Sequence, residues 1–144
     1  MSAAPNKKRI IFVCVGNSCR SQMAEGFAKY YAKKMGLNAE IRSGGTRPQG
    51  YIHPEAIKVM AEKGIDISKQ QSKGINPQEL IDFDVVIAMG CSDKEVCPVN
   101  FRGVSADWGI EDPFDQPIEA YRKTRDQIES KIKELFSTIS KYSN

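Results

Sequence analysis

Residues 14–21, Cys-Val-Gly-Asn-Ser-Cys-Arg-Ser, place the strongest constraint on how this chain can fold. They follow an apolar, β-branched run at residues 9–13, which is typical of a buried strand. After them, Met23, Phe27 and Met35 recur at about helical spacing. The stretch is therefore predicted to be a loop that opens a helix, where free backbone N–H groups and the helix dipole favour an anion. With the guanidinium of Arg20 beside them, these groups suit a tetrahedral oxyanion such as phosphate.

Cys14 lies at the start of this loop, where the same field favours the thiolate form of a cysteine and makes it a nucleophile. Gly16 allows the backbone to approach an oxyanion, and Asn17 tolerates a left-handed conformation. Ser21 can donate its hydroxyl proton to the Cys14 sulfur. The alternative is that Cys14 is a core residue ending a strand, but such a position would not require Arg20 next to the loop. The pattern predicts an enzyme.

The composition is that of one globular domain of 144 residues, with 40% apolar and 27% charged residues. A net charge of +3 gives no reason to expect binding to nucleic acid or to a membrane surface. The sequence has no stretch of about 20 apolar residues and no signal peptide, so a cytoplasmic protein is expected. Residues 1–144 are predicted to form a single domain and a monomer, with a flexible terminus at about residues 1–8.

Predicted strands and helices alternate along the chain, which indicates an α/β fold with a parallel sheet. We expect a single domain with a four-stranded parallel sheet flanked by helices on both faces. Ligands in such folds bind at the carboxyl ends of the strands, where we expect Cys14, Ser43, Cys91 and Asp107 to converge. The expected strands cover residues 9–15, 39–42, 84–89 and 103–106, and the expected helices cover residues 20–35, 54–64, a short segment from 77, and 117–139.

The loop pattern Cys-x-Gly-Asn-x-Cys-Arg-Ser resembles the phosphate loop of the low-molecular-weight protein tyrosine phosphatase fold. Residues 21–26 are similar to the thioredoxin-coupled arsenate reductase branch of that fold, because the phosphatases usually carry proline where Gln22 stands. The likeness continues through Ser43-Gly44, residues 64–68 and residues 108–113, so it covers nearly the whole chain. In this family the loop amides bind the oxyanion; the resemblance assigns that role to Val15, Gly16, Asn17, Ser18, Cys19 and Arg20.

Asp112-Pro113 follows the fourth predicted strand. In this fold an Asp-Pro at that place supplies a general acid above the anion site, and a carboxyl group held by a rigid proline suits proton delivery. A plain turn would also explain the dipeptide. Glu111 and Asp115 are nearby carboxylates, but the family pattern favours Asp112.

Cys91 and Cys97 distinguish the two activities that the resemblance implies. In a reductase, Cys14 attacks arsenate while Arg20 holds it, and Asp112 protonates the leaving hydroxyl. Cys91 then attacks Cys14, releasing arsenite, and Cys97 attacks Cys91. The resulting disulfide is reduced by thioredoxin, and each sulfur transfer is ordinary thiol–disulfide exchange. The polar residues 92–96 are expected to form a mobile loop that permits these transfers.

Three alternatives remain open. Cys91 and Cys97 can be incidental thiols on a phosphatase that hydrolyses phosphotyrosine or aryl phosphates. The four cysteines can hold zinc, although their spacing and the charge of Arg20 fit a zinc site poorly. A non-catalytic phosphate-binding or redox-partner module is a third class.

Two features depart from the reductase pattern. Gly90 stands where the reductases place the first cysteine of this loop, and Cys91 follows it. Phe114 after Asp112-Pro113 resembles the phosphatases, in which an aromatic residue lines the site for an aryl substrate. Tyr51 is a loose match to a second aromatic residue of the phosphatases.

The remaining assignments concern single residues. Cys19 is expected to pack behind the loop, His53 to cap the helix that begins at Pro54, and Trp108 to anchor the core or its rim. No tightly bound cofactor is expected. Some reductases of this branch bind a potassium ion, and the resemblance implies Asn17, Glu25, Ser43 and Asp66 as its ligands; a hydrogen-bond network that braces the loop is the alternative.

Overall fold

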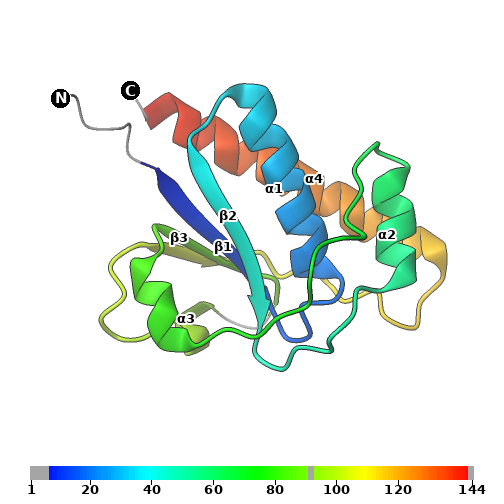
Figure 1. Ribbon diagram of the computed structural model, residues 1–144, viewed down its shortest axis with the longest axis horizontal. Helices are drawn as coiled ribbons and strands as arrows, with labels where there is room; N and C mark the ends of the chain where they lie inside the picture. The colour runs from blue at the N-terminus through cyan, green and yellow to red at the C-terminus, as the bar shows by residue number, and fades with distance from the viewer. Residues whose placement is uncertain (1–6, 91–92, 143–144) are drawn as a thin grey trace.

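Four short strands form the central sheet in the computed structural model, which describes residues 7–90 and 93–142. The four strands are parallel and lie in the order β2-β1-β3-β4 (Figure 1). The prediction of a four-stranded parallel sheet is therefore confirmed. The strands are β1 (Lys8–Cys14), β2 (Ala39–Gly45), β3 (Val85–Ala88) and β4 (Val104–Asp107).

The helices also follow the prediction, with one addition. Asn76 caps the short 3-10 helix, as expected, by accepting a hydrogen bond from the backbone N–H of Gln78 at 3.0 Å. Residues 93–96 were expected to belong to a loop, but they form one helical turn. The helices are α1 (Arg20–Met35), α2 (Pro54–Ala61), η1 (Pro77–Asp82), α3 (Asp93–Val96) and α4 (Ile118–Tyr142).

Helical elements cover both faces of the sheet because β1 alternates its apolar side chains between them. Ile10 and Phe12 point into the larger core, which contains the apolar residues of α1, α2 and α4. Ile11 and Val13 point into a smaller cluster with Leu80 of η1. In Figure 1, α1 and α4 lie side by side on one side of the sheet. This arrangement confirms the predicted three-layer architecture.

The strand register brings the carboxyl ends of the strands to one edge. Cys14 lies opposite Gly45 of β2, and Ala88 lies opposite both Val13 of β1 and Asp107 of β4. The predicted meeting of Cys14 with Asp107 at this edge is confirmed. Ser43 does not end its strand, because β2 continues to Gly45.

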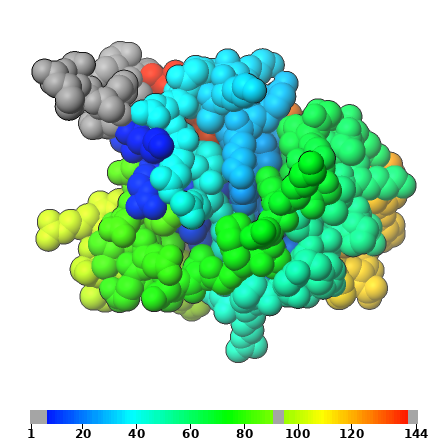
Figure 2. All heavy atoms as spheres, viewed as in Figure 1, coloured from blue at the N-terminus to red at the C-terminus, as the bar shows by residue number. Residues whose placement is uncertain are grey.

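The segment between α2 and η1 crosses the outer side of this edge. The backbone N–H of Gly45 donates to the carbonyl of Lys73 at 2.9 Å, and the N–H of Ile75 donates to the carbonyl of Gly45 at 3.2 Å. Figure 2 shows this green segment packed over the end of β2 and the start of α1. It therefore holds the edge from outside.

Two observations concern the ends and the surface of the chain. Of the terminus expected to be flexible, residues 1–6 lie outside the described part, and Lys8 already pairs with Ala39 in the sheet. No helix within residues 7–90 and 93–142 is long and apolar enough to span a membrane.

An ion-pair cluster ties α2 to α4 and makes a prediction about acid stability. Glu62 accepts from Arg122 and from Arg125, each at 2.7 Å, and the hydrogen bond from Arg122 is the main cause that lowers the pKa of Glu62 from 4.5 to about 2. A carboxylate with a lowered pKa stabilises the folded state above its unfolded pKa, and this contribution disappears as the pH falls through the folded value.

We therefore expect Glu62→Gln to unfold at lower urea concentration than wild type at pH 7. The difference between the two midpoints should shrink between about pH 4.5 and pH 2. The control is Glu134→Gln, which changes an exposed carboxylate of α4 outside this cluster. A difference between Glu62→Gln and wild type that stays constant across this pH range would contradict the expectation.

Candidate active site

Backbone groups outside the loop at residues 14–20 bind its carbonyl oxygens. In a trans peptide the C=O and the following N–H point in opposite directions, so a carbonyl held from outside turns the next N–H toward the loop centre. The loop therefore presents several N–H groups to one point, as an oxyanion site requires. The donors are the N–H groups of Arg47, Gln49 and His53, which reach the carbonyls of Val15, Gly16 and Ser18 at 2.8, 2.9 and 2.8 Å.

Cys14 lies at the floor of this cradle and is 2% exposed. The backbone N–H of Asn17 points at its sulfur at 3.2 Å, and the Ser21 hydroxyl lies 2.8 Å from it. Both groups can donate a hydrogen bond to the sulfur. Asn17 has the left-handed conformation that its residue type allows, with φ of 47°. A pocket of about 310 Å³ opens above Cys14.

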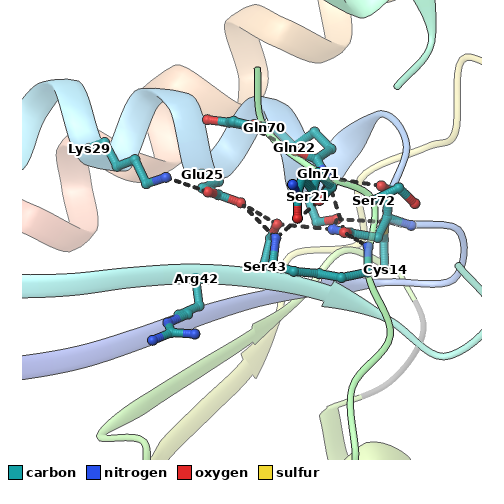
Figure 3. A network of polar contacts seen from close by, with 12 residues as sticks. Cys14, Ser21, Gln22, Glu25, Lys29, Arg42, Ser43, Gln70, Gln71 and Ser72 are labelled. Carbon is teal, nitrogen blue, oxygen red and sulfur yellow. Dashed lines mark hydrogen bonds and ion pairs between the residues drawn. The ribbon is translucent and has the colours of Figure 1, made fainter. Parts of the chain in front are cut away.

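A chain of buried hydrogen bonds connects Cys14 to α1 and fixes which group donates to which (Figure 3). The Asn17 side-chain NH₂ donates to the hydroxyls of Ser21 at 2.8 Å and Ser43 at 3.0 Å. Ser43 in turn donates to the Glu25 carboxylate. Because the Ser21 oxygen already accepts from Asn17, its own proton is left for the Cys14 sulfur. The two ends of this hydrogen-bond chain are thus both acceptors: the Cys14 sulfur at one end and the Glu25 carboxylate at the other.

Arg20 joins the loop to the strand ends next to it. Its guanidinium donates to the backbone carbonyl of Met89, just past β3, and to that of Ile110 at 2.9 Å. It also lies 3.7 Å from the carboxylate of Asp112, whose side chain is half exposed. The structure therefore brings together Arg20 and Asp112, which the sequence placed 92 residues apart, at the mouth of the Cys14 pocket. An acid at this mouth can protonate a group leaving the bound oxyanion.

Sequence reasoning missed part of the pocket wall. His53 is the N-cap residue of α2, as predicted, but its side chain makes no capping hydrogen bond. It is buried, and its Nε2 lies 3.2 Å from both the Ser18 hydroxyl and the Gln49 side-chain oxygen. Arg47 and Gln49 were not predicted as site residues; their position directly after β2, at the carboxyl edge, was the available signal. Phe114 packs 5.4 Å from the His53 ring.

Cys19 and Trp108 take the positions expected of them. Cys19 is 3% exposed, and burial raises the pKa of its thiol, which makes it a poor nucleophile. Trp108 is partly buried, with its ring 5.9 Å from that of Phe12 in the larger core.

The two relay cysteines are placed only in part. Cys91 lies outside the described residues. Cys97 is partly exposed and packs against the cluster of Ile11 and Val13. This cluster lies on the face of the sheet opposite the larger core to which Cys14 belongs.

The residues implied for a potassium ion are engaged in other contacts. Asn17 Oδ1 accepts from the Gln22 side chain at 3.0 Å and from the backbone N–H of Lys73 at 2.8 Å. The Asp66 carboxylate accepts from Ser68, whose hydrogen bonds lower the Asp66 pKa. These hydrogen bonds form the bracing network that was the alternative interpretation, and potassium binding stays a prediction. No group of three or more His, Cys, Asp or Glu side chains in the described part of the chain could hold a metal ion.

Comparison with known proteins agrees with this geometry. The family model described as "Low molecular weight phosphotyrosine protein phosphatase" matches residues 9–144. The chain belongs to this family. Arsenate reductase 1 of Staphylococcus epidermidis is 43% identical over 128 residues, which cover 88% of this chain and 93% of that protein.

Two solved structures represent the two activities of the family. An arsenate reductase in the phosphate-binding state has a TM-score of 0.77 and 38% identity, covering 92% of this chain and 98% of that one. A YwlE arginine phosphatase mutant with a phosphorylated active-site serine has a TM-score of 0.82 and 30% identity, covering 93% and 97%. The fold of this family is thus shown for the chain, and both chemistries occur among its neighbours.

The variant Gly45→Ala tests whether β2 must approach the loop closely. A Cβ at this position would lie 2.5 Å from the Val15 carbonyl oxygen and 2.9 Å from the Asn17 nitrogen. We expect Gly45→Ala to lower the free energy of unfolding by about 2–3 kcal/mol and to weaken phosphate binding. In the control Gly74→Ala, the nearest atom is 3.5 Å from the new Cβ. Urea denaturation and calorimetry measure the two effects, and equal behaviour of both variants would contradict the expectation.

Ser21→Ala tests the hydroxyl that faces the nucleophile. Its loss removes one hydrogen bond to the sulfur and leaves the Asn17 NH₂ with one fewer acceptor. We expect alkylation of Cys14 by iodoacetamide at pH 7 to slow by roughly tenfold, since one hydrogen bond to a charged group contributes about 1.5–3 kcal/mol. Peptide mass spectrometry assigns the modified cysteine. Ser130→Ala, on the exposed side of α4, serves as the control and should react as wild type does.

Proposed function

We propose that the protein is an arsenate reductase that uses Cys14 as nucleophile and passes the oxidation through Cys91 to Cys97 for reduction by thioredoxin. The observation that carries the proposal is the partly exposed cysteine Cys97 between β3 and β4, the strands that end beside the nucleophile. A phosphatase needs no such thiol, because water completes its reaction. The 43% identity to an arsenate reductase over most of both chains supports the same choice.

The first step uses groups described above. The Cys14 thiolate attacks arsenic(V) of arsenate held by the loop N–H groups and Arg20. A hydroxyl leaves as water after it receives a proton from Asp112, and a Cys14 S–As bond forms. The buried floor and the fixed N–H groups stabilise the developing charge without reorganisation at the moment of reaction.

The second step supplies the electrons. The Cys91 thiolate attacks the Cys14 sulfur, and the electron pair of the S–As bond passes to arsenic, which leaves as arsenite, arsenic(III). Two thiols are oxidised to one disulfide, which balances the two-electron reduction of arsenic. Cys97 then attacks Cys91, so that Cys14 returns as a thiolate and a Cys91–Cys97 disulfide is formed.

The placement of Cys97 explains why a relay needs two further cysteines. Cys14 belongs to the core on one face of the sheet, whereas Cys97 packs on the other. Cys97 is also partly exposed, so a disulfide at this position is open to a protein reductant. A second thiol is therefore required to carry the oxidation from Cys14 to Cys97, and we propose Cys91, which follows β3 in the sequence, for this role. The proposal implies a cytoplasmic protein, because the cytoplasm maintains the thioredoxin system. A monomer stays the predicted oligomeric state.

Hydrolysis of phosphate esters is the second candidate function. The exposed ring of Phe114 lies at the mouth of the pocket beside His53 and can contact an aryl group. The same loop and the same Asp112 would then form and release a cysteinyl phosphate.

Paired assays separate these functions. One measures arsenate-dependent NADPH oxidation with thioredoxin and thioredoxin reductase, and the other measures hydrolysis of p-nitrophenyl phosphate. We expect Cys97→Ser to lower steady-state arsenate turnover by at least about a hundredfold while it leaves ester hydrolysis unchanged, since only the relay uses that thiol. Replacing thioredoxin with glutathione and glutaredoxin tests the reductant.

Each other outcome has a defined meaning. Arsenate turnover that survives Cys97→Ser would refute the three-cysteine relay. Hydrolysis by wild type without arsenate turnover would favour the phosphatase. Oxyanion binding without either activity would favour a binding module.

A further inference from the structure

Glu25 of α1 is a buried carboxylate, 4% exposed, that two lysines approach from outside. Lys29 Nζ lies 2.5 Å from its Oε2, and Lys73 Nζ lies 3.5 Å from its Oε1. A buried charge is costly unless it is paired and hydrogen-bonded. The two ammonium groups and the Ser43 hydroxyl therefore allow Glu25 to remain a carboxylate in this position.

The charge of Glu25 sets the direction of the hydrogen bonds that end at the nucleophile. An ionised carboxylate only accepts, so Ser43 must donate to it, and the Asn17 NH₂ must donate to Ser43. The second proton of that NH₂ goes to Ser21, which then donates to Cys14. Figure 3 shows Lys29, Glu25 and Ser43 in line with this chain. A positive charge that holds Glu25 thus acts on the cradle without touching the substrate.

Lys73 is fixed more firmly than an exposed lysine on a helix. Its backbone N–H donates to Asn17 Oδ1 at 2.8 Å, and its carbonyl accepts from Gly45 at 2.9 Å. The same residue therefore orients the Asn17 amide through its backbone and pairs with Glu25 through its side chain. One ammonium balances the carboxylate, and the other leaves a net positive charge on a group that hydrogen bonds connect to the cradle.

We propose that Lys73, with Lys29, takes the place of a bound monovalent cation in this protein and is a positioning residue for the oxyanion cradle. The oxygen atoms that a potassium ion would need are engaged by N–H and ammonium donors, as described above. The fixed ammonium groups supply the same charge at all salt compositions. The inference goes beyond the proposed function, because it applies whether the bound oxyanion is reduced or hydrolysed.

Binding of inorganic phosphate, measured by isothermal titration calorimetry, tests the proposal without any turnover. The wild-type protein should bind phosphate equally well in choline, sodium and potassium chloride of equal ionic strength. The double variant Lys29→Met/Lys73→Met should bind about tenfold more weakly in choline chloride, the effect of losing roughly 1.4 kcal/mol of charge interaction. Potassium chloride should restore part of this affinity, because the freed Glu25 can then pair with the ion.

Two further variants serve as controls. Lys58→Met removes an exposed lysine of α2 and should bind phosphate as wild type does. Lys73→Arg keeps the charge and should also bind phosphate as wild type does. Thermal unfolding shows whether the double variant folds, and if it does not, the phosphate affinity of Lys73→Arg still tests the proposal.

Three results would overturn the proposal. In the first, wild type binds phosphate more tightly in potassium than in choline or sodium chloride. In the second, the double variant matches Lys58→Met, or Lys73→Arg loses the affinity that its charge should preserve. The third is weakened binding in the double variant that potassium does not restore, which would leave the lysines with a structural role only.

Discussion

The buried side-chain amide of Asn17 is the interaction on which the active-site loop depends. Its oxygen accepts from the Lys73 backbone and from Gln22, and its NH₂ donates to Ser21 and Ser43. Each of these four partners lies either outside the loop or on α1, the helix that follows it. Aspartate in this position would lose both donors, and alanine would lose every side-chain hydrogen bond. A residue whose own backbone points at the nucleophile thus also holds the elements around it together.

The cradle forms because the loop carbonyls have partners elsewhere, not because the loop has an intrinsic shape. Residues 46–53 donate to these carbonyls, and the Ser72 hydroxyl adds a bond to the carbonyl of Gly16 at 3.2 Å. The close approach requires Gly45, where any Cβ would meet the loop backbone. The anion site is therefore a property of three segments far apart in sequence, held at one edge by the parallel register of β1 and β2.

The fold and the loop around Cys14 could be predicted from the sequence because both depend on local patterns. Strand and helix periodicity located the sheet, and the Cys14–Arg20 spacing located the loop. The pocket wall could not be predicted in the same way. His53 resembles a helix cap when only its neighbour Pro54 is considered, but its side chain turns inward because Ser18, Tyr121 and Phe114 surround it in space. The segment after Gly90 was expected to be loop, and tertiary packing of Val96 against the smaller cluster makes part of it helical.

The loop does not determine which reaction follows the attack by Cys14. Its N–H groups stabilise negative charge on any tetrahedral oxyanion, so phosphate esters and arsenate fit the same cradle. What differs is the group that resolves the bond to Cys14. Water needs only a base near the pocket mouth, whereas reduction needs a thiol that moves across the sheet edge. Arg20 is relevant to both reactions, because its guanidinium donates hydrogen bonds to the carbonyls of Met89 and Ile110. Arg20, the predicted ligand of the oxyanion, is thus hydrogen-bonded both to the end of β3 and to the loop that carries Asp112. An oxyanion that binds to this guanidinium would therefore share it with these two carbonyls.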